Sequence, residues 1–261
     1  MKLLPFWVRR PMEALYERRL AATLVGLPAP KHVGIMLDGN RRWARQAGHE
    51  DVREGYRVGG AKVPGFLEWC TAAGIEHVTL FMLSDDNLDR PAEQLVPLIG
   101  IIEQTVREIS AGGLPWEVQV IGALDLLPGD TARTLKEAAA ATSGRGGMRV
   151  DVAVGYGGRR EIADAVRAAF ETHMALGGDP ADLVAEFEVD HISRHLYSST
   201  GHDKVDLVIR TSGELRLSGF LLWQSAYAEM HFVDAFWPAF RRVDFLRALR
   251  SYANRERRYG K

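Results

Sequence analysis

The chain has 261 residues, of which 46% are hydrophobic and 26% are charged, and its formal net charge is -1. These values fit a globular protein of one or two domains with a substantial core. A nearly neutral chain argues against a nucleic-acid binder that works through bulk positive charge, so any anion site has to be local. The single cysteine, Cys70, excludes a disulfide framework within the chain and a cysteine-rich zinc site, and a reducing cytoplasm is its natural setting.

The N-terminal stretch combines apolar and basic side chains, among them Phe6, Trp7 and Arg9. It lacks the continuous apolar region of a signal peptide, and no stretch of the chain approaches the roughly 18 apolar residues of a membrane span. A helix packed on the domain is favoured over one lying on a membrane surface, because Glu13 and Glu17 interrupt its basic face. Membrane contact stays open as the alternative.

Short apolar runs alternate with amphipathic stretches along the rest of the chain. The apolar runs predict strands at 33–37, 77–83, 116–121, 148–154 and 205–209, and two further short strands at 221–223 and 230–233. The amphipathic stretches predict helices at 55–71, 93–110, 131–141, 160–175 and 243–257, with two short helical pieces after Pro180.

This alternation predicts one α/β domain whose central sheet is mainly parallel and flanked by helices. No repeat, low-complexity run or long linker divides the chain. In such a sheet, ligands bind beyond the carboxyl ends of the strands. Polar or glycine-rich segments follow four of the predicted strands, so they are expected to meet at one edge of the sheet; they are 38–42, 84–90, 155–159 and 210–218.

The densest of these signals lies in the segment 32–47, HVGIMLDGNRRWARQA. Its apolar run ends at an Asp-Gly pair that begins with Asp38, and Arg41, Arg42 and Arg45 follow. A carboxylate, a glycine and several arginines at the end of a strand suit a metal ion and a polyanion such as a diphosphate. The structural alternative is an Asp-Gly turn followed by solvated arginines.

A second dense segment runs from 209 to 229. Arg210, Arg216 and Ser218 can present two guanidinium groups and a hydroxyl to phosphate oxygens. Glu214 is equally suited to neutralising one of these arginines. The carboxylate of Glu229 stands in apolar company, so it either pairs with an arginine or helps to hold a metal ion.

One motif is discounted. The letters from Asp85 to Asp89 spell DDxxD, the magnesium-binding signature of the all-helical trans-type prenyl diphosphate synthases, but the run occurs once, follows a predicted strand and ends at Arg90 and Pro91. A loop and helix N-terminus is therefore favoured over a metal site.

Taken together, four segments resemble the cis-prenyltransferase family, whose best-known member is undecaprenyl diphosphate synthase. They are HVGIMLDGNRRWA, the SxxNxxRP pattern of Ser84, Asn87, Arg90 and Pro91, GYGGRREI at 155–162, and DLVIRTSGELRLSGFLLWQSAYAE with its continuation to FWP. The similarity extends from Lys31 to Gly260 in the family's order. It implies an N-terminal helical segment at 1–30, a catalytic domain at 31–261 and an apolar product tunnel.

Members of this family join isopentenyl diphosphate to an allylic diphosphate with Mg²⁺ and form a cis double bond at each addition. The resemblance implies catalytic roles for Asp38, Asn40 and Asn87, with Asn87 assisting proton loss from isopentenyl diphosphate. It implies that Asp38 and Glu229 bind the metal, with Glu229 reaching toward a neighbouring subunit's site. Substrate contacts are implied at Gly39, Arg41, Arg42, Trp43, Arg53, Ser84, Asn87, Arg90, Arg210, Arg216, Ser218, Arg258 and Gly260.

Within the set of substrate contacts, Gly39, Asn40 and Arg42 are expected to hold the allylic diphosphate, and Arg210, Arg216 and Ser218 the isopentenyl diphosphate. The RxG ending closed by Gly260 matches the motif that completes the site across a dimer interface. The resemblance therefore implies a homodimer.

Departures from the long-chain pattern point to the product. Tyr56 and Leu215 each replace a histidine, Leu88 replaces a tryptophan, and the arginine expected after the first motif is shifted, which leaves Arg53 as its nearest match. Met82 stands where long-chain enzymes carry alanine in the strand that lines the tunnel. A bulky side chain there stops elongation early, because packed interiors tolerate little added volume.

With Met82 and Leu88 as chain-length determinants, the chain resembles short-chain members that make (2Z,6E)-farnesyl diphosphate from geranyl and isopentenyl diphosphate. The alternative is a medium- or long-chain polyprenyl diphosphate synthase. Head-to-middle condensation of two dimethylallyl units and an inactive scaffold subunit are less favoured, since the substrate-binding set and the Asp-Gly-Asn loop are intact. The expected location is the cytoplasm, and no nucleic-acid partner is expected.

Overall fold

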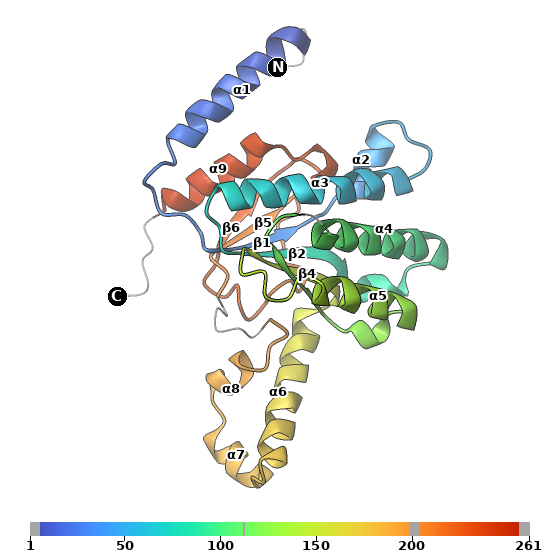
Figure 1. Cartoon of the computed structure of the whole chain (residues 1–261), viewed down its shortest axis with the longest axis vertical. Coiled ribbons are helices and arrows are strands. Elements are labelled where there is room, and N and C mark those ends of the chain that lie inside the picture. Colours follow the sequence, from blue (N-terminus) through green and yellow to red (C-terminus); the bar gives the residue numbers. More distant parts are fainter. Residues whose placement is uncertain (1–5, 112, 199–203, 256–261) are drawn as a thin grey trace.

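Within residues 6–111, 113–198 and 204–255, which the computed structural model describes, six strands form a parallel sheet in the order β3-β4-β2-β1-β5-β6 (Figure 1). Every neighbouring pair is parallel. The strands are β1 His32–Met36, β2 His77–Ser84, β3 Glu117–Ile121, β4 Arg149–Tyr156, β5 Leu207–Arg210 and β6 Glu229–Phe232. The predicted parallel α/β fold is therefore confirmed.

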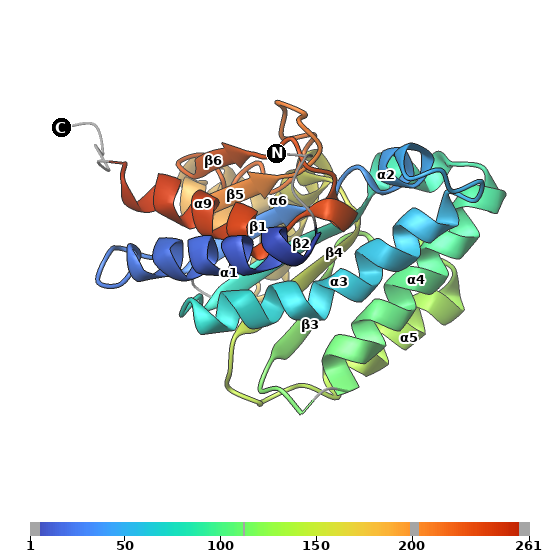
Figure 2. The ribbon, with the colours of Figure 1, turned by 90° about the horizontal axis from the view of Figure 1, so that it is seen from above.

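One layer of helices covers one face of the sheet, and a helical arm projects from the other side (Figures 1 and 2). The covering helices are α3 Arg53–Ala72, α4 Ala92–Ala111, α5 Gly129–Ala140 and α9 Arg242–Ala253, and the arm consists of α6 Gly158–Ala175, α7 Pro180–Glu186 and α8 Val189–Ser193. The remaining elements are α1 Phe6–Ala22, α2 Asn40–Gln46 and the 3₁₀ helices η1 Asp85–Asp89, η2 Leu124–Leu126 and η3 Trp237–Ala239.

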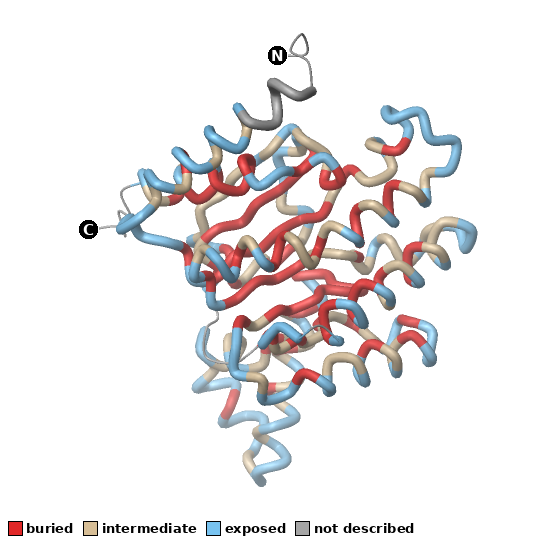
Figure 3. Tube along the Cα trace, turned by 45° about the horizontal axis from the view of Figure 1, so that its top comes forward, coloured by how far each residue is buried: buried red, intermediate tan, exposed pale blue. Residues whose placement is uncertain are grey.

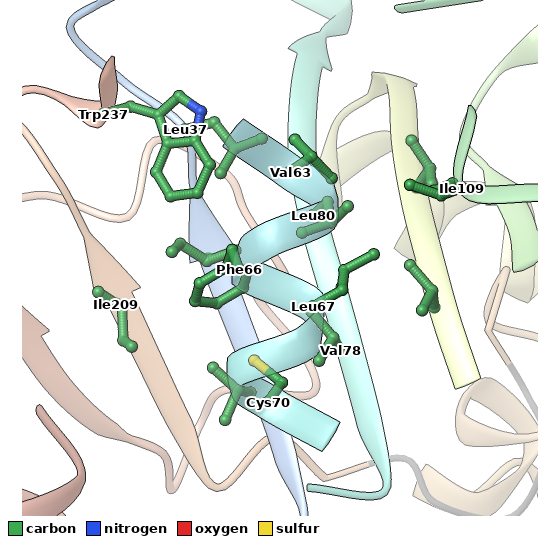
Figure 4. Close-up of a cluster of buried hydrophobic side chains, with 14 of the residues drawn as sticks. Leu37, Val63, Phe66, Leu67, Cys70, Val78, Leu80, Ile109, Ile209 and Trp237 are labelled. Carbon is green, nitrogen blue, oxygen red and sulfur yellow. The ribbon is translucent and has the colours of Figure 1, made fainter. Parts of the chain in front are cut away.

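The main core lies between the sheet and this layer, and the strands are its most deeply buried part (Figure 3). In α3, Val63, Phe66, Leu67 and Cys70 follow helical spacing and are completely buried against β1 and β2 (Figure 4). The ring of Phe66 meets the rings of Trp237, Phe240 and Phe245 edge-on, at centroid distances of 5.7, 6.3 and 5.5 Å. This packing fixes α3 and η3 beside the carboxyl end of β1.

Helix α1 lies against α9 (Figures 1 and 2). Leu20 is buried in the core, and Glu13 forms an ion pair with Arg241 at 3.3 Å. Met12 and Leu15 remain more than half exposed. In the described part of the chain, every helix is too short or too polar to cross a bilayer. The division into segments 1–30 and 31–261 stays a prediction.

The predicted elements correspond closely to the observed ones, with three differences. The strand predicted at 221–223 is wrong, because residues 221–227 form turns and Leu221 has a φ of 46°. Helix α2 occupies a stretch that was expected to be a loop, and residues 85–89, expected to be a loop and helix N-terminus, form the 3₁₀ helix η1. The terminal helix ends at Ala253 rather than extending to 257, although residues 256 and 257 lie outside the described part.

Candidate functional site

The carboxyl ends of the parallel strands place the polar segments at one edge of the sheet, as predicted. Asp38 follows β1, and Arg210 is the last residue of β5, which pairs directly with β1. Strand β2, the other neighbour of β1, ends at Ser84. Segments distant in sequence are therefore brought together by strand order alone.

Local hydrogen bonds fix the turn at Asp38. The main-chain N–H of Asp38 donates to Thr211 Oγ1 at 3.0 Å, and the N–H of Gly39 donates to Asp38 Oδ1 at 2.6 Å. Gly39 has a φ of 96°, and a Cβ atom there would lie 2.6 Å from the Phe236 ring. Only glycine fits this position, so the Asp-Gly pair serves the site's geometry as well as its chemistry.

Four ion pairs link five charged side chains around this turn, which we call the charge ring: Asp38, Arg42, Arg210, Glu214 and Arg216. Arg210 Nη2 lies 3.1 Å and Arg42 Nη2 3.6 Å from Asp38 Oδ2. Glu214 receives Arg42 Nη1 on Oε1 at 2.8 Å and Arg216 Nη1 on Oε2 at 2.5 Å. Three guanidinium groups against two carboxylates leave a local excess of positive charge, which suits an anion.

Arg210 is the buried anchor of the charge ring, and only 4% of its side chain is exposed. Its Nη1 donates to Ser218 Oγ at 3.0 Å and to the main-chain oxygen of Arg216. Its Nε is buried and has no hydrogen-bond partner among the described residues. The burial and these contacts hold the guanidinium in place at this edge of the sheet.

The loop after β5 carries backbone strain beside the charge ring. Ser212 and Ser218 have φ angles of 78° and 46°, which are left-handed values uncommon outside glycine. Each serine contacts an arginine of the ring: Ser212 Oγ accepts from Arg42 Nη2 at 2.8 Å, and Ser218 Oγ accepts from Arg210. Such strain concentrates at functional sites, where the surrounding structure holds it in place.

A second group of implied residues lies around β2 and η1. Ser84 precedes η1 and Asn87 lies within it, both half-buried. The half-buried Arg90 has its Nη1 3.4 Å from the hydroxyl of Tyr56. Burial lowers the pKa of Arg90, and the charge of Arg41 lowers it further.

Not every implied substrate contact lies at the charge ring. Arg41 donates from Nη1 to Gln94 Oε1 at 2.9 Å and so is bound to α4. Arg53 is largely exposed at the start of α3 and pairs with Asp51, just before the helix, at 2.6 Å. Trp43 stacks on His49. Arg258 and Gly260 lie outside the described residues.

Asn40 faces the interior between α2 and α3. Its Nδ2 donates to the main-chain oxygen of Leu37 at 2.9 Å, while its Oδ1 is buried without a hydrogen-bond partner among the described residues. The two helices approach closely because Gly55 and Gly59 face this residue; a Cβ at Gly59 would lie 2.3 Å from Asn40 Oδ1.

Met82 occupies a β-bulge. Phe81 pairs with Ala153 and Leu83 with Val154, so Met82 is the extra residue between them. Bulges re-aim side chains near active sites, and Met82 lines a cavity of about 20 Å³. The other lining residues come mainly from α3 and α4 and include Asn40, Tyr56, Gly59, Leu98, Ile101, Ile102 and Trp237. Leu88 is partly buried against the same core.

Glu229 lies far from Asp38 within one chain. It pairs with Leu207, which pairs with Val33, so Glu229 is level with the start of β1 while Asp38 follows its end. At about 3.3 Å per residue, these levels are roughly 16 Å apart. Glu229 forms an ion pair with Arg255. A metal ion shared by both carboxylates would need the Glu229 of a second copy.

The aspartate-rich run lies apart from the charge ring. Asp85 lies 3.8 Å from Arg160 and packs closely against Gly157. Glu161 of the GYGGRREI segment is completely buried and accepts hydrogen bonds from the Tyr156 hydroxyl at 2.5 Å and from Gln224 at 3.1 Å. Burial raises the pKa of Glu161. The hydrogen bond between Glu161 and Gln224 therefore connects α6 with the turns at residues 221–227.

Sequence reasoning missed several residues that shape the site. Thr211 bonds the Asp38 turn, Ser212 bonds Arg42, and Phe236 packs against Gly39 and lies 5.5 Å from the Arg42 guanidinium. The polar Thr-Ser-Gly run directly after a strand was a usable signal for the first two. Phe236 belongs to the FWP segment of the resemblance, but its contact with the Asp38 turn could not be predicted, because only folding brings it to β1.

The fold and the charge ring together define a parallel α/β protein with a cluster of three arginines and two carboxylates at the carboxyl edge of its sheet. The family model described as "Putative undecaprenyl diphosphate synthase" matches residues 35–260. The chain therefore belongs to the undecaprenyl diphosphate synthase family, and it is a prenyltransferase, as the sequence predicted.

The similarity to curated relatives extends over nearly the whole chain. Isoprenyl transferase 2 of Streptomyces coelicolor is 64% identical over 97% of this chain and 98% of its own length. The (2Z,6E)-farnesyl diphosphate synthase of Mycolicibacterium smegmatis is 52% identical over 100% of both chains. The crystal structure of lavandulyl diphosphate synthase from Lavandula x intermedia in complex with dimethylallyl diphosphate has a TM-score of 0.82 at 31% identity, covering 89% of this chain and 99% of that one.

Proposed function

We propose that the protein condenses isopentenyl diphosphate with geranyl diphosphate to (2Z,6E)-farnesyl diphosphate and releases diphosphate. The observation that carries this proposal is the charge ring, whose three arginines come from α2, β5 and the loop after β5. Two diphosphates need separate groups of fixed donors. Arg42 with Gly39 and Asn40 is assigned to the allylic diphosphate, and Arg210, Arg216 and Ser218 to isopentenyl diphosphate.

The reaction breaks an allylic C–O bond and needs stabilisation of the departing diphosphate. Arg42 is held by Asp38, Ser212 and Glu214, so its orientation is set before substrate arrives. Donors that are already oriented lower the barrier because they do not have to reorganise as charge develops. Asn87 is assigned the assistance of proton loss from isopentenyl diphosphate, with Arg90 beside it.

Asp38 fits a role in holding Mg²⁺. Its carboxylate is 38% exposed at the edge of the sheet, and oxygen ligands suit this cation, which usually takes one or two carboxylates together with substrate phosphates and waters. The bound metal would neutralise part of the charge on the departing diphosphate. Glu229 is assigned as a second carboxylate to the neighbouring subunit's site.

We propose a homodimer, because a metal ion held by both Asp38 and Glu229 would need the Glu229 of a second copy. Apolar side chains are also exposed on the helical arm and near β6, where Leu176, Val189 and Tyr227 are 84%, 65% and 83% exposed. Exposed apolar side chains of this size can contribute to a protein interface. Sedimentation of the protein at several concentrations tests the proposal, and a monomer at micromolar concentration would contradict it.

Met82, which lines the same cavity as Asn40, is assigned the control of product chain length. The alternatives are longer products and head-to-middle condensation; the lavandulyl diphosphate synthase shares the fold, whereas the Mycolicibacterium relative at 52% identity is named a (2Z,6E)-farnesyl diphosphate synthase. The similarity therefore favours one elongation step.

Purified protein, Mg²⁺ and labelled isopentenyl diphosphate, with each allylic primer in turn, test the proposed function. Geranyl diphosphate is expected to give (2Z,6E)-farnesyl diphosphate. Products several isoprene units longer would contradict the short-chain assignment, and condensation of dimethylallyl diphosphate alone would favour the head-to-middle reaction. The Asp38→Ala variant is expected to lose about 10³-fold or more in kcat; unchanged turnover would contradict the assigned site.

A further inference from the structure

Glu214 joins two arginines that belong to different substrates in the proposed function. One carboxylate oxygen receives Arg42 Nη1 at 2.8 Å, and the other receives Arg216 Nη1 at 2.5 Å. Arg42 lies in α2, while Arg216 lies in the loop after β5. A single carboxylate therefore connects the allylic group of donors with the isopentenyl group.

The setting of Glu214 differs from that of an ordinary surface ion pair. Asp130 and Arg133 pair at 2.7 Å within one helix, with 88% of the aspartate side chain exposed. The Glu214 side chain is 26% exposed, and Arg42 is 172 positions away in sequence. The hydrogen bond from Arg42 and the charge of Arg216 lower the pKa of Glu214, so it is ionised at neutral pH.

Backbone hydrogen bonds hold Glu214 in place. The N–H of Ser212 donates to the main-chain oxygen of Ala235 at 2.8 Å, and the N–H of Gly213 donates to that of Val233 at 3.0 Å. Both residues have positive φ angles, so the chain reverses sharply just before Glu214. The carboxylate is thus presented from a fixed loop.

The two arginines depend on Glu214 to different degrees. Arg42 also bonds Ser212 and lies near Asp38. The Arg216 side chain is 63% exposed, and within the described residues Glu214 is its one ion-pair partner. Without this carboxylate, Arg216 would sample many rotamers and would lose order that it must recover when a diphosphate binds.

We propose that Glu214 is a positioning residue that couples the two diphosphate subsites, holding Arg42 and Arg216 so that both substrates bind in register for condensation. The inference rests on the proposed function, because it takes the two arginines to serve different substrates. It predicts that one substitution weakens the binding of both substrates, whereas loss of either arginine weakens mainly one.

The test compares KM for geranyl and isopentenyl diphosphate in Glu214→Ala, Glu214→Gln, Arg42→Ala and Arg216→Ala. Glu214→Ala is expected to raise both KM values by about threefold to tenfold, the range of one lost intramolecular hydrogen bond. Glu214→Gln keeps the size and one acceptor oxygen, and is expected to fall between the wild type and Glu214→Ala. Asp130→Ala is the matched control and leaves both values unchanged.

A double variant separates coupling from general damage to the site. In an Arg42→Ala background, Glu214→Ala is expected to add nothing to the KM for geranyl diphosphate but still to raise the KM for isopentenyl diphosphate. An increase in only one KM after Glu214→Ala would overturn the proposal. So would a double variant in which the two substitutions raise the KM for geranyl diphosphate by the full product of their separate effects.

A failure of the proposed function can be distinguished from a failure of the inference about Glu214. In that case the wild type would form no product with any primer, and calorimetric titration with each diphosphate alone would then supply the same comparison as Kd values. The same pattern in Kd would support the coupling by Glu214, and unchanged values in Glu214→Ala would overturn it.

Discussion

Replacing Met82 with alanine is expected to lengthen the product by about one isoprene unit, from farnesyl to the next homologue. The cavity beside Met82 measures about 20 Å³, which is enough for one water molecule but not for the five carbons of an isoprene unit. At roughly 30 Å³ per non-hydrogen atom, taken from the volume of liquid water, the five carbons of a further unit need on the order of 150 Å³.

Met82→Ala removes three non-hydrogen atoms, Cγ, Sδ and Cε, and so frees roughly 90 Å³ on the same scale. The freed volume is a little more than half of what one further unit needs, so the product is expected to lengthen by at most one unit. The substitution also costs stability, about 2 kcal/mol, the low end for such truncations, because Met82 is only partly buried. A urea titration would establish how much folded protein enters the assay.

The assay is chromatography of products made from geranyl and labelled isopentenyl diphosphate, run for the wild type, Met82→Ala and Met148→Ala. Met148 is 7% exposed and bonds to β3 through its main chain at the amino end of the sheet, so it matches the size of the change away from the site. An unchanged product distribution in folded Met82→Ala would refute the assignment of this cavity as the limit to elongation.

Three further predictions follow from individual contacts. Arg210→Met is expected to raise the KM for isopentenyl diphosphate at least about tenfold in steady-state kinetics, and to lower stability by about 1 to 3 kcal/mol because its hydrogen-bond partners are left behind; an unchanged KM would contradict its assignment. Gly59→Ala, whose Cβ would lie 2.3 Å from Asn40 Oδ1, should cost about 1 to 3 kcal/mol in urea unfolding, whereas Gly65→Ala, with nothing within 4 Å, should be neutral or slightly stabilising; equal effects would contradict the close approach of α2 and α3. Burial raises the pKa of the Cys70 thiol well above 9.0, so above this pH the unfolded chain loses a proton that the folded protein keeps. Wild-type stability is therefore expected to fall by about 1.4 kcal/mol per pH unit more steeply than that of Cys70→Ala, up to the folded pKa, and parallel slopes in alkaline urea titrations would contradict this.

The sequence determined the order of strands and helices, because each element carries its own periodicity and its own breaks. Right-handed crossovers then implied a parallel sheet, and a parallel sheet implied that Asp38 and Arg210 end up at one edge. The motif spacing identified the family, which the comparisons confirmed. Local signals failed where the backbone departs from regular structure: the apolar letters at 221–223 looked like a strand, although positive φ at Leu221 closes a turn.

Only the tertiary structure decided which charges meet. Arg41 and Arg42 are adjacent in sequence, yet the first is bound to Gln94 and the second enters the charge ring, because successive helical side chains point in different directions. The separation of Glu229 from Asp38 follows from strand register, which no local pattern encodes. The bridge formed by Glu214 likewise depends on the folded loop after β5. Its two partners, Arg42 and Arg216, come from separate parts of the chain, so no local sequence pattern predicts that they meet the same carboxylate.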